Sequence, residues 1–311
     1  MTVDEQLERY LKKCAARGGC GERTIQNYRI NLLTFLNWWN GSDLKQLTED
    51  DIDDYIIYLQ ELDAIGLTTL NNKLRDLRAF LKYAHSRGWC EKISIKLLNV
   101  QEPDIVPLTD GQLKEIYDAC MMKKTLDRYR DYTIMRLLEE TGIRINECLN
   151  LKLDDIEGNV VKLRQTKNKM AREAYLTPAM RKELNLYLEA RQRFMVANEI
   201  KPNKNLWIVT KGPTIGHTVA IGTVQERIRK YGRLAGIPVR VSPHTFRHTF
   251  ARNFLMAGGD MFTLQELLGH ATLEMVRRYV RLFNRDRQVN YFKTMENHQR
   301  NKKRNNKPKF P

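Results

Sequence analysis

Apolar side chains recur at helical spacing through the first 97 residues, and this pattern limits the possible folds more than any other feature. Between residues 25 and 39 the apolar positions with this spacing include Ile25, Tyr28, Leu32, Leu33, Phe35, Leu36 and Trp39. Steps of three and four residues place such side chains on one face of an α-helix. Stretches with the same period begin at Leu7, Ile52 and Leu70, and glycines separate them. The sequence therefore predicts a domain of four packed helices over residues 1–98.

Two local features add detail to this helical domain. The acidic run at residues 49–54 follows Thr48. This order suits a helix start, because a threonine hydroxyl caps free N–H groups and carboxylates favour the positive end of the helix dipole. The larger aromatic side chains are expected to pack in the core or between helices and not to stack on bases: Trp38, Trp39, Phe80 and Tyr83.

A linker is expected over residues 99–108, where two prolines interrupt the chain and no helical period is present. Thr109 or Asp110 then caps a new helix and opens a second domain over residues 109–290. Residues 160–164 and 173–176 flank a polar turn and predict a β-hairpin, and residues 206–209 predict another short strand. The fold class expected is mainly α with a small β-sheet.

The charge of the chain favours a polyanionic partner. Net charge is +16, and residues 291–311 carry 7 Lys and Arg against 1 Asp or Glu. Residues 1–100 carry 14 of each kind, so most of the excess lies in the second domain. The basic C-terminal tail, 291–311, is low in apolar residues, and its part from 299 on is expected to be disordered without a partner.

Location is expected to be cytoplasmic. No apolar run approaches the roughly 18 residues of a membrane span, and the first ten residues lack the apolar region of a secretory signal. The five cysteines are widely spaced and form no C-x-x-C pair, so they are expected to be reduced thiols.

A dense group of cations, imidazoles and one phenol lies near the end of the second domain. His244 and Arg247 are three positions apart and share a helical face, with Pro243 suited to the first turn. His270 follows a Leu-Leu-Gly sequence, and Tyr279 comes nine residues later. Phosphodiester cleavage without metal needs a nucleophile, cations for the phosphate oxygens and an acid for the leaving oxygen. These residue types supply all three.

With two earlier basic residues the group resembles the tyrosine recombinase (phage integrase) family, in particular its Xer-like two-domain members. The family order is Arg, Lys, His-x-x-Arg, His, Tyr, which the chain matches with Arg144, Lys167, His244, Arg247, His270 and Tyr279. The resemblance implies an N-terminal four-helix core-binding (SAM-like) domain and an α+β catalytic domain. It implies cleavage and rejoining of duplex DNA through a 3′-phosphotyrosyl link, without metal, ATP or another cofactor.

The resemblance also implies a role for each residue. Arg144 and Arg247 would grip the phosphate, since a guanidinium is planar, always charged and can form two bonds. Glu147, three positions after the first arginine, would orient it. Lys167 would protonate the leaving 5′ oxygen, with Lys169 as competitor, and Arg172 has the spacing of the arginine that follows in the family hairpin.

The remaining members of the motif supply hydrogen bonds and the nucleophile. His244 would accept or share a proton, and His270 would bond a phosphate oxygen. Tyr279 would attack, because the cations at 277, 278 and 281 favour its phenolate. His248 is expected to pack behind these groups.

Three alternatives stay open. A zinc site at His244 and His248 is disfavoured by adjacent arginines and the lack of a nearby cysteine or following glutamate. A type IB topoisomerase-like strand transferase would use similar chemistry as a monomer, and a non-catalytic DNA-binding regulator would need none of it. The chain lacks a G-x-x-x-x-G-K-[ST] phosphate loop.

The partners expected are a specific duplex DNA site and further copies of the chain, as a tetramer on DNA by family analogy. A DNA-bending or excision protein is a possible accessory; no membrane partner is expected, and the protein would be nucleoid-associated. Besides Lys169, polar residues of the second and fourth helices are candidate DNA contacts: Thr24, Asn27, Asn71, Asn72, Lys73, Arg75 and Arg78.

Overall fold

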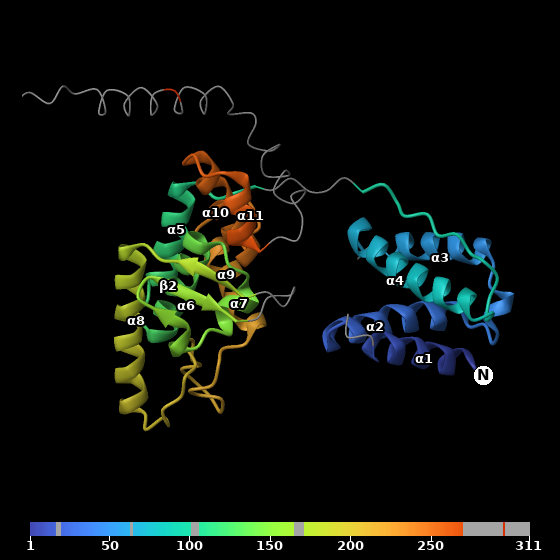
Figure 1. Ribbon diagram of the computed structural model, residues 1–311, viewed down its shortest axis with the longest axis horizontal. Helices are drawn as coiled ribbons and strands as arrows, with labels where there is room; N and C mark the ends of the chain where they lie inside the picture. The colour runs from blue at the N-terminus through green and yellow to red at the C-terminus, as the bar shows by residue number, and fades with distance from the viewer. Residues whose placement is uncertain (17–19, 63–64, 101–105, 165–170, 270–294, 296–311) are drawn as a thin grey trace, which may run out of the picture. The chain divides into compact units, whose positions relative to one another are not determined.

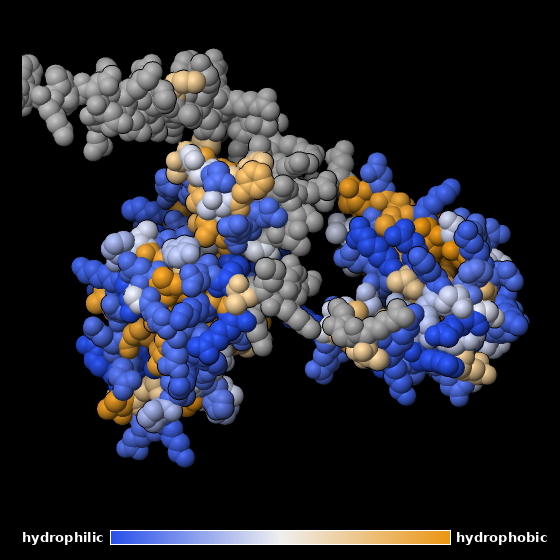
Figure 2. All heavy atoms as spheres, viewed as in Figure 1, coloured by the Kyte–Doolittle hydropathy of each residue, from blue (hydrophilic) through white to orange (hydrophobic). Residues whose placement is uncertain are grey.

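The computed structural model divides the chain into two compact units, Met1–Pro103 and Asp104–Pro311, called here the N-terminal and C-terminal units. It describes the chain except for residues 17–19, 63–64, 101–105, 165–170, 270–294 and 296–311. Both units expose a mainly hydrophilic surface in the view of Figure 2. Within the described residues, no helix is long and apolar enough to cross a membrane.

The N-terminal unit contains the four helices that the apolar period predicts (Figure 1). They are α1 (Val3–Ala16), α2 (Glu22–Trp39), α3 (Glu49–Glu61) and α4 (Leu67–Ser86), with the short 3₁₀ helix η1 (Leu44–Gln46) before α3. Thr48 caps α3 as expected: its hydroxyl accepts from the backbone N of Asp51 at 3.2 Å, and the Asp51 carboxylate accepts from the backbone N of Thr48 at 2.8 Å. This reciprocal pair satisfies two donors at the helix start.

Aromatic residues fill the centre of this unit. Phe35 and Phe80 are fully buried, and Phe35 meets the ring of Tyr55 edge-on at 5.0 Å between centroids. Tyr83 is buried, while Trp38 and Trp39 pack against the same cluster half-buried. The expectation that these aromatic side chains pack within the domain is therefore confirmed.

The C-terminal unit is mainly helical with one small sheet, which confirms the expected fold class. Its elements in chain order are α5 (Asp110–Met121), α6 (Leu126–Thr141), α7 (Ile145–Leu149), η2 (Leu153–Asp155), β1 (Ile156–Glu157), β2 (Val160–Leu163), β3 (Arg172–Tyr175), α8 (Pro178–Ala197), α9 (Ile221–Leu234), α10 (Pro243–Met256) and α11 (Met261–Leu268). Thr109 caps α5, in a reciprocal pair with Gln112.

The sheet is antiparallel in the order β1-β2-β3. Val161 lies opposite Ala174 and Leu163 opposite Arg172, so the predicted hairpin is confirmed. The predicted strand at 206–209 is wrong. Within the segment only Ile208 makes an isolated bridge, to Thr218, while Leu206, Trp207 and Ile208 are buried in the core. A few backbone hydrogen bonds join the segment to residues 216–219, and burial explains its apolar run.

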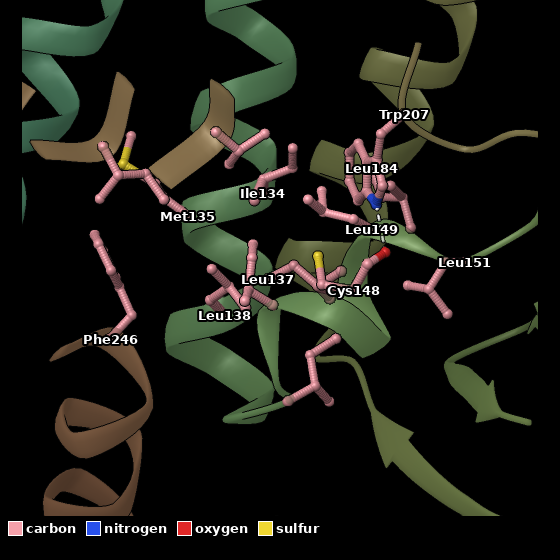
Figure 3. Close-up of a cluster of buried hydrophobic side chains, with 14 of the residues drawn as sticks. Ile134, Met135, Leu137, Leu138, Cys148, Leu149, Leu151, Leu184, Trp207 and Phe246 are labelled. Atoms are coloured by element: carbon pink, nitrogen blue, oxygen red, sulfur yellow. Dashed lines mark hydrogen bonds between the residues drawn. The ribbon is translucent and has the colours of Figure 1, made fainter. Parts of the chain in front are cut away.

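Helix α6 lies at the centre of the core of this unit, packed against α8 and α10 (Figure 3). Ile134, Leu137 and Leu138 on α6 are fully buried, as is Phe246 on α10. The indole N–H of Trp207 donates to the backbone oxygen of Cys148 at 2.7 Å, which satisfies the one polar atom of a large buried ring. This packing fixes α7 and α10, the two helices next to the motif arginines.

Candidate active site

Arg144 lies in the turn between α6 and α7, where Gly142 caps the end of α6 with a positive φ of 61°. Its backbone N donates to Glu147 Oε2 at 2.8 Å, and its Nη1 donates to Glu147 Oε1 at 3.1 Å. The carboxylate thus caps α7 and holds the guanidinium at the same time. The contact that the three-residue spacing suggests is present.

Arg247 and His244 lie on α10, and the start of this helix is fixed by the sequence Ser-Pro. The Ser242 hydroxyl accepts from the backbone N of Thr245 at 3.3 Å, and Pro243 occupies the first turn, where no N–H partner is needed. Arg247 is only 4% exposed. Its Nη1 donates to the backbone oxygen of Gly142 at 2.6 Å, so it reaches the turn just before Arg144.

Arg172 begins β3 and reaches the same place from the sheet. Its Nη2 donates to Glu147 Oε2 at 2.6 Å, so one buried carboxylate binds the two guanidiniums of Arg144 and Arg172. A carboxylate between two arginines offsets part of the repulsion between their positive charges.

The three arginines converge on the C-terminal end of α11. Arg172 donates to the backbone oxygen of Leu267, Arg247 to that of Leu268 at 2.7 Å, and Arg144 to that of Gly269 at 2.9 Å. The last carbonyls of a helix have no partner within it and form the negative end of its dipole. Guanidiniums are therefore well suited to this end. The arrangement joins residues up to 125 positions apart, and no spacing in the sequence indicated it.

His244 is exposed beside these cations. Desolvation of the ring lowers its pKa, and the positive charges of Arg247 and Arg144 lower it further. The ring is therefore neutral at neutral pH and can accept a proton. His248 is half-buried one turn further on, with ring centroids 6.5 Å apart. Among the described residues, no cluster of His, Cys, Asp or Glu is arranged to hold a metal ion.

Four predicted residues fall outside the described part of the chain: Lys167, Lys169, His270 and Tyr279. Their neighbours are described. Lys167 belongs to the segment between β2 and β3, and His270 directly follows Gly269, whose carbonyl binds Arg144. Their roles stay predictions.

The candidate DNA contacts of the N-terminal unit divide into exposed and internal groups. Five are exposed: Thr24 and Asn27 on α2, and Asn72, Arg75 and Arg78 on α4. Lys73 is half-buried and donates to Asn31 Oδ1 at 3.3 Å. Burial lowers its pKa.

Asn71 needs a correction. It is 4% exposed, donates to the backbone oxygen of Leu98 at 2.8 Å and accepts from the backbone N of Leu98 at 2.9 Å. Both ends of the amide are therefore occupied inside the unit, where they tie α4 to the segment that follows it. This pairing argues against a DNA contact by Asn71, and the polar residue type alone could not reveal it.

Comparison with known proteins identifies the family. A model described as the phage integrase family matches residues 107–285, and a model of the phage integrase N-terminal SAM-like domain matches residues 7–91. The chain belongs to the phage integrase family. It is an enzyme of the tyrosine recombinase class, and its curated relatives carry that name.

Two of these relatives span nearly the same length as this chain. A tyrosine recombinase of Agathobacter rectalis is 29% identical over 294 residues, covering 89% of this chain and 92% of the relative. The tyrosine recombinase XerC of Thermodesulfovibrio yellowstonii is 28% identical over 280 residues, covering 88% of this chain and 90% of the relative.

Solved structures support the fold. A lambda integrase (75-356) dimer bound to a COC′ core site has a TM-score of 0.70 at 19% identity, covering 88% of this chain and 97% of that one. The Tn1549 transposon integrase in complex with circular intermediate DNA has a TM-score of 0.68 at 22% identity, covering 90% and 95%.

Proposed function

We propose that the protein is a site-specific DNA recombinase or integrase that cuts and rejoins duplex DNA through a 3′-phosphotyrosyl intermediate on Tyr279. One observation carries the proposal. Arg144 and Arg247, 103 positions apart in the sequence, both bind the end of α11, directly before His270. A phosphate at this place would meet two permanent cations and the neutral imidazole of His244. Relatives crystallised on DNA core sites support the same substrate class.

The chemistry follows from the residue types. The tyrosine oxygen attacks the scissile phosphorus, the bond to the 5′ oxygen breaks, and that oxygen takes a proton from Lys167. His244 accepts the phenolic proton. The arginines balance charge on the non-bridging oxygens. Because the phosphotyrosyl bond conserves the energy of the broken bond, a 5′-hydroxyl can rejoin the strand by the reverse step without ATP. Metal and cofactor are not required by this scheme.

The assembly is part of the proposal. We expect further copies of the chain to bind paired sites, as in the lambda integrase tetramer bound to a Holliday junction. The exposed residues of α2 and α4, for example Asn72 and Arg75, would contact DNA from the N-terminal unit.

The test is a covalent trap. A duplex enriched from random DNA by repeated selection on the protein is nicked near its centre, so that the cleaved strand loses a short fragment and cannot rejoin. Wild-type protein in excess EDTA should form a denaturant-resistant adduct that maps to Tyr279. Tyr279→Phe should bind the duplex with unchanged affinity and form none. An adduct on another residue, or one that needs added metal, would refute the proposal, while nicking and relaxation without exchange between two sites would favour the topoisomerase-like alternative.

A further inference from the structure

Arg172 has two different partners, a backbone carbonyl of α11 and the carboxylate of Glu147. Its Nη1 donates to the backbone oxygen of Leu267 and its Nη2 to Glu147 Oε2 at 2.6 Å. The side chain is 11% exposed. One planar guanidinium therefore joins the last turn of α11 to the carboxylate that orients Arg144.

The contact with α11 is close enough to restrict the turn. Gly269 has a φ of +61°, which disfavours a side chain. A Cβ atom built there would lie 2.7 Å from Arg172 Nε and 3.1 Å from its Cδ. Within the described chain Nε is buried and has no hydrogen-bond partner. The arginine side chain thus lies close against Gly269 in the turn.

Arg172 is less exposed than Arg144, the other arginine that binds Glu147. Arg144 keeps 30% of its side chain exposed and Arg172 keeps 11%, although each directs both terminal nitrogens to protein partners. The place of Arg172 in the chain adds a third link, because it follows the segment that holds Lys167 and opens β3.

We propose that Arg172 is a positioning residue for the cleavage step. It holds Glu147, and through Glu147 also Arg144, at a fixed position relative to the turn before His270. The inference rests on the proposed function. A lysine keeps the charge but has a single nitrogen, so it cannot hold a carboxylate and a carbonyl in the geometry of a planar fork. The consequence is that charge alone does not replace this arginine.

The experiment measures single-turnover adduct formation at saturating DNA, with the selected nicked duplex, for Arg172→Lys and Arg172→Ala. We expect both variants to cleave about 10²-fold more slowly, the loss typical of a small misplacement of a catalytic group. Binding affinity should be unchanged. The matched control is Arg233→Lys, because Arg233 is an exposed arginine that pairs with Glu226 at 3.0 Å in the same unit. It should cleave at the wild-type rate.

A second substrate shows whether Arg172 acts through the phosphate-binding arginines. A methylphosphonate at the scissile position carries no charge, so a misplaced Arg144 matters less. The decrease in cleavage rate relative to wild type should be smaller on this substrate than on phosphate for both Arg144→Ala and Arg172→Lys. Equal losses of Arg172→Lys on both substrates, or a wild-type rate on phosphate, would overturn the proposal. Failure of the wild-type protein to form any adduct would instead refute the proposed function.

Thermal unfolding tests the contact itself, independently of activity. Gly269→Ala should lower Tm more than Gly236→Ala, because Gly236 has a similar φ of +66° but open space where its Cβ would lie. This extra decrease in Tm should become smaller when Arg172 is also changed to Ala. An extra decrease that persists in the double variant would show that Arg172 does not lie against the turn.

Discussion

The Glu147 carboxylate is the anion that the arginine cluster shares, and it is 4% exposed. Removing one partner of a buried ion pair leaves the other charge uncompensated, which costs about 3–5 kcal/mol. We therefore expect Glu147→Ala to lower the free energy of unfolding of the C-terminal unit by roughly this amount, as measured by urea denaturation.

The structure contains a control for this prediction. Glu226 also binds two arginines, Arg229 and Arg233, but on the surface of α9 and 55% exposed. Exposed pairs are weak because water and salt screen them. Glu226→Ala should therefore change the midpoint of urea denaturation only a little. Similar decreases in the free energy of unfolding for the two variants would mean that the ion pairs of Glu147 do not owe their stabilising effect to burial.

His244 predicts a loss of stability in acid. Its pKa in the folded protein lies below the usual 6.5, through desolvation and the charges of Arg247 and Arg144. At neutral pH both folded and unfolded forms are neutral. As pH falls through 6.5 the unfolded chain takes up a proton first, so stability decreases until the folded-state pKa is passed.

Urea denaturation between pH 7.5 and 5.5 measures this effect against His244→Asn. The variant should lose less stability on acidification than the wild type, since the other histidines titrate in both proteins. An equal or larger loss in the variant would mean that His244 is not the residue with the lowered pKa.

At the scale of elements, the start of α10 connects local sequence to the site. Ser242 caps the helix that carries His244 and Arg247, through a bond of 3.3 Å to the backbone N of Thr245. Loss of an N-cap side chain costs about 1 kcal/mol. We expect Ser242→Ala to cost this amount and also to slow adduct formation, because the fraying turn holds His244.

Thr48→Ala is the matched control, since Thr48 caps α3 in the N-terminal unit with a comparable bond of 3.2 Å to Asp51. It should lose similar stability in its own unit while the cleavage rate at saturating DNA stays unchanged. Equal effects on cleavage would point to general loss of folded protein and away from a local effect at α10.

Local signals predicted the helices and the hairpin, because each depends on period, caps and turns within a few residues. The apolar segment at 206–209 was not predictable in this way. A buried run and a strand have the same composition, and only the surrounding core decides between them. Asn71 shows the same limit, since its partner Leu98 lies 27 residues away.

At the scale of the whole molecule, the motif order indicated candidate site residues but not how the structure holds them. Arg172 and Leu267 lie 95 positions apart, and Arg144 and Gly269 lie 125 apart. Backbone carbonyls carry no sequence signature, so the use of the α11 end as a common anchor follows only from the tertiary packing. The contact between Arg144 and Glu147 could be predicted because the two residues lie within one helical turn.

The basic tail gives a prediction for the complete chain on DNA. Residues 299–311 lie outside the described structure and contain six lysines and arginines with no acidic residue. If these cations neutralise phosphates, deletion of 299–311 should reduce the slope of log affinity against log salt by about 0.9 for each phosphate that is no longer neutralised. The measurement is a gel-shift titration of a single site at several salt concentrations.

The competing role for this tail is docking on a neighbouring copy. We favour phosphate contact because docking in this family relies on an apolar helix, and the apolar residues lie upstream, at Val289, Tyr291, Phe292 and Met295. As a control, substitution of Tyr291 and Phe292 by Ser should leave the salt slope intact and weaken cooperative binding to paired sites. If instead deletion of 299–311 leaves the slope unchanged and abolishes cooperativity, the tail docks on protein and its positive charge serves another purpose.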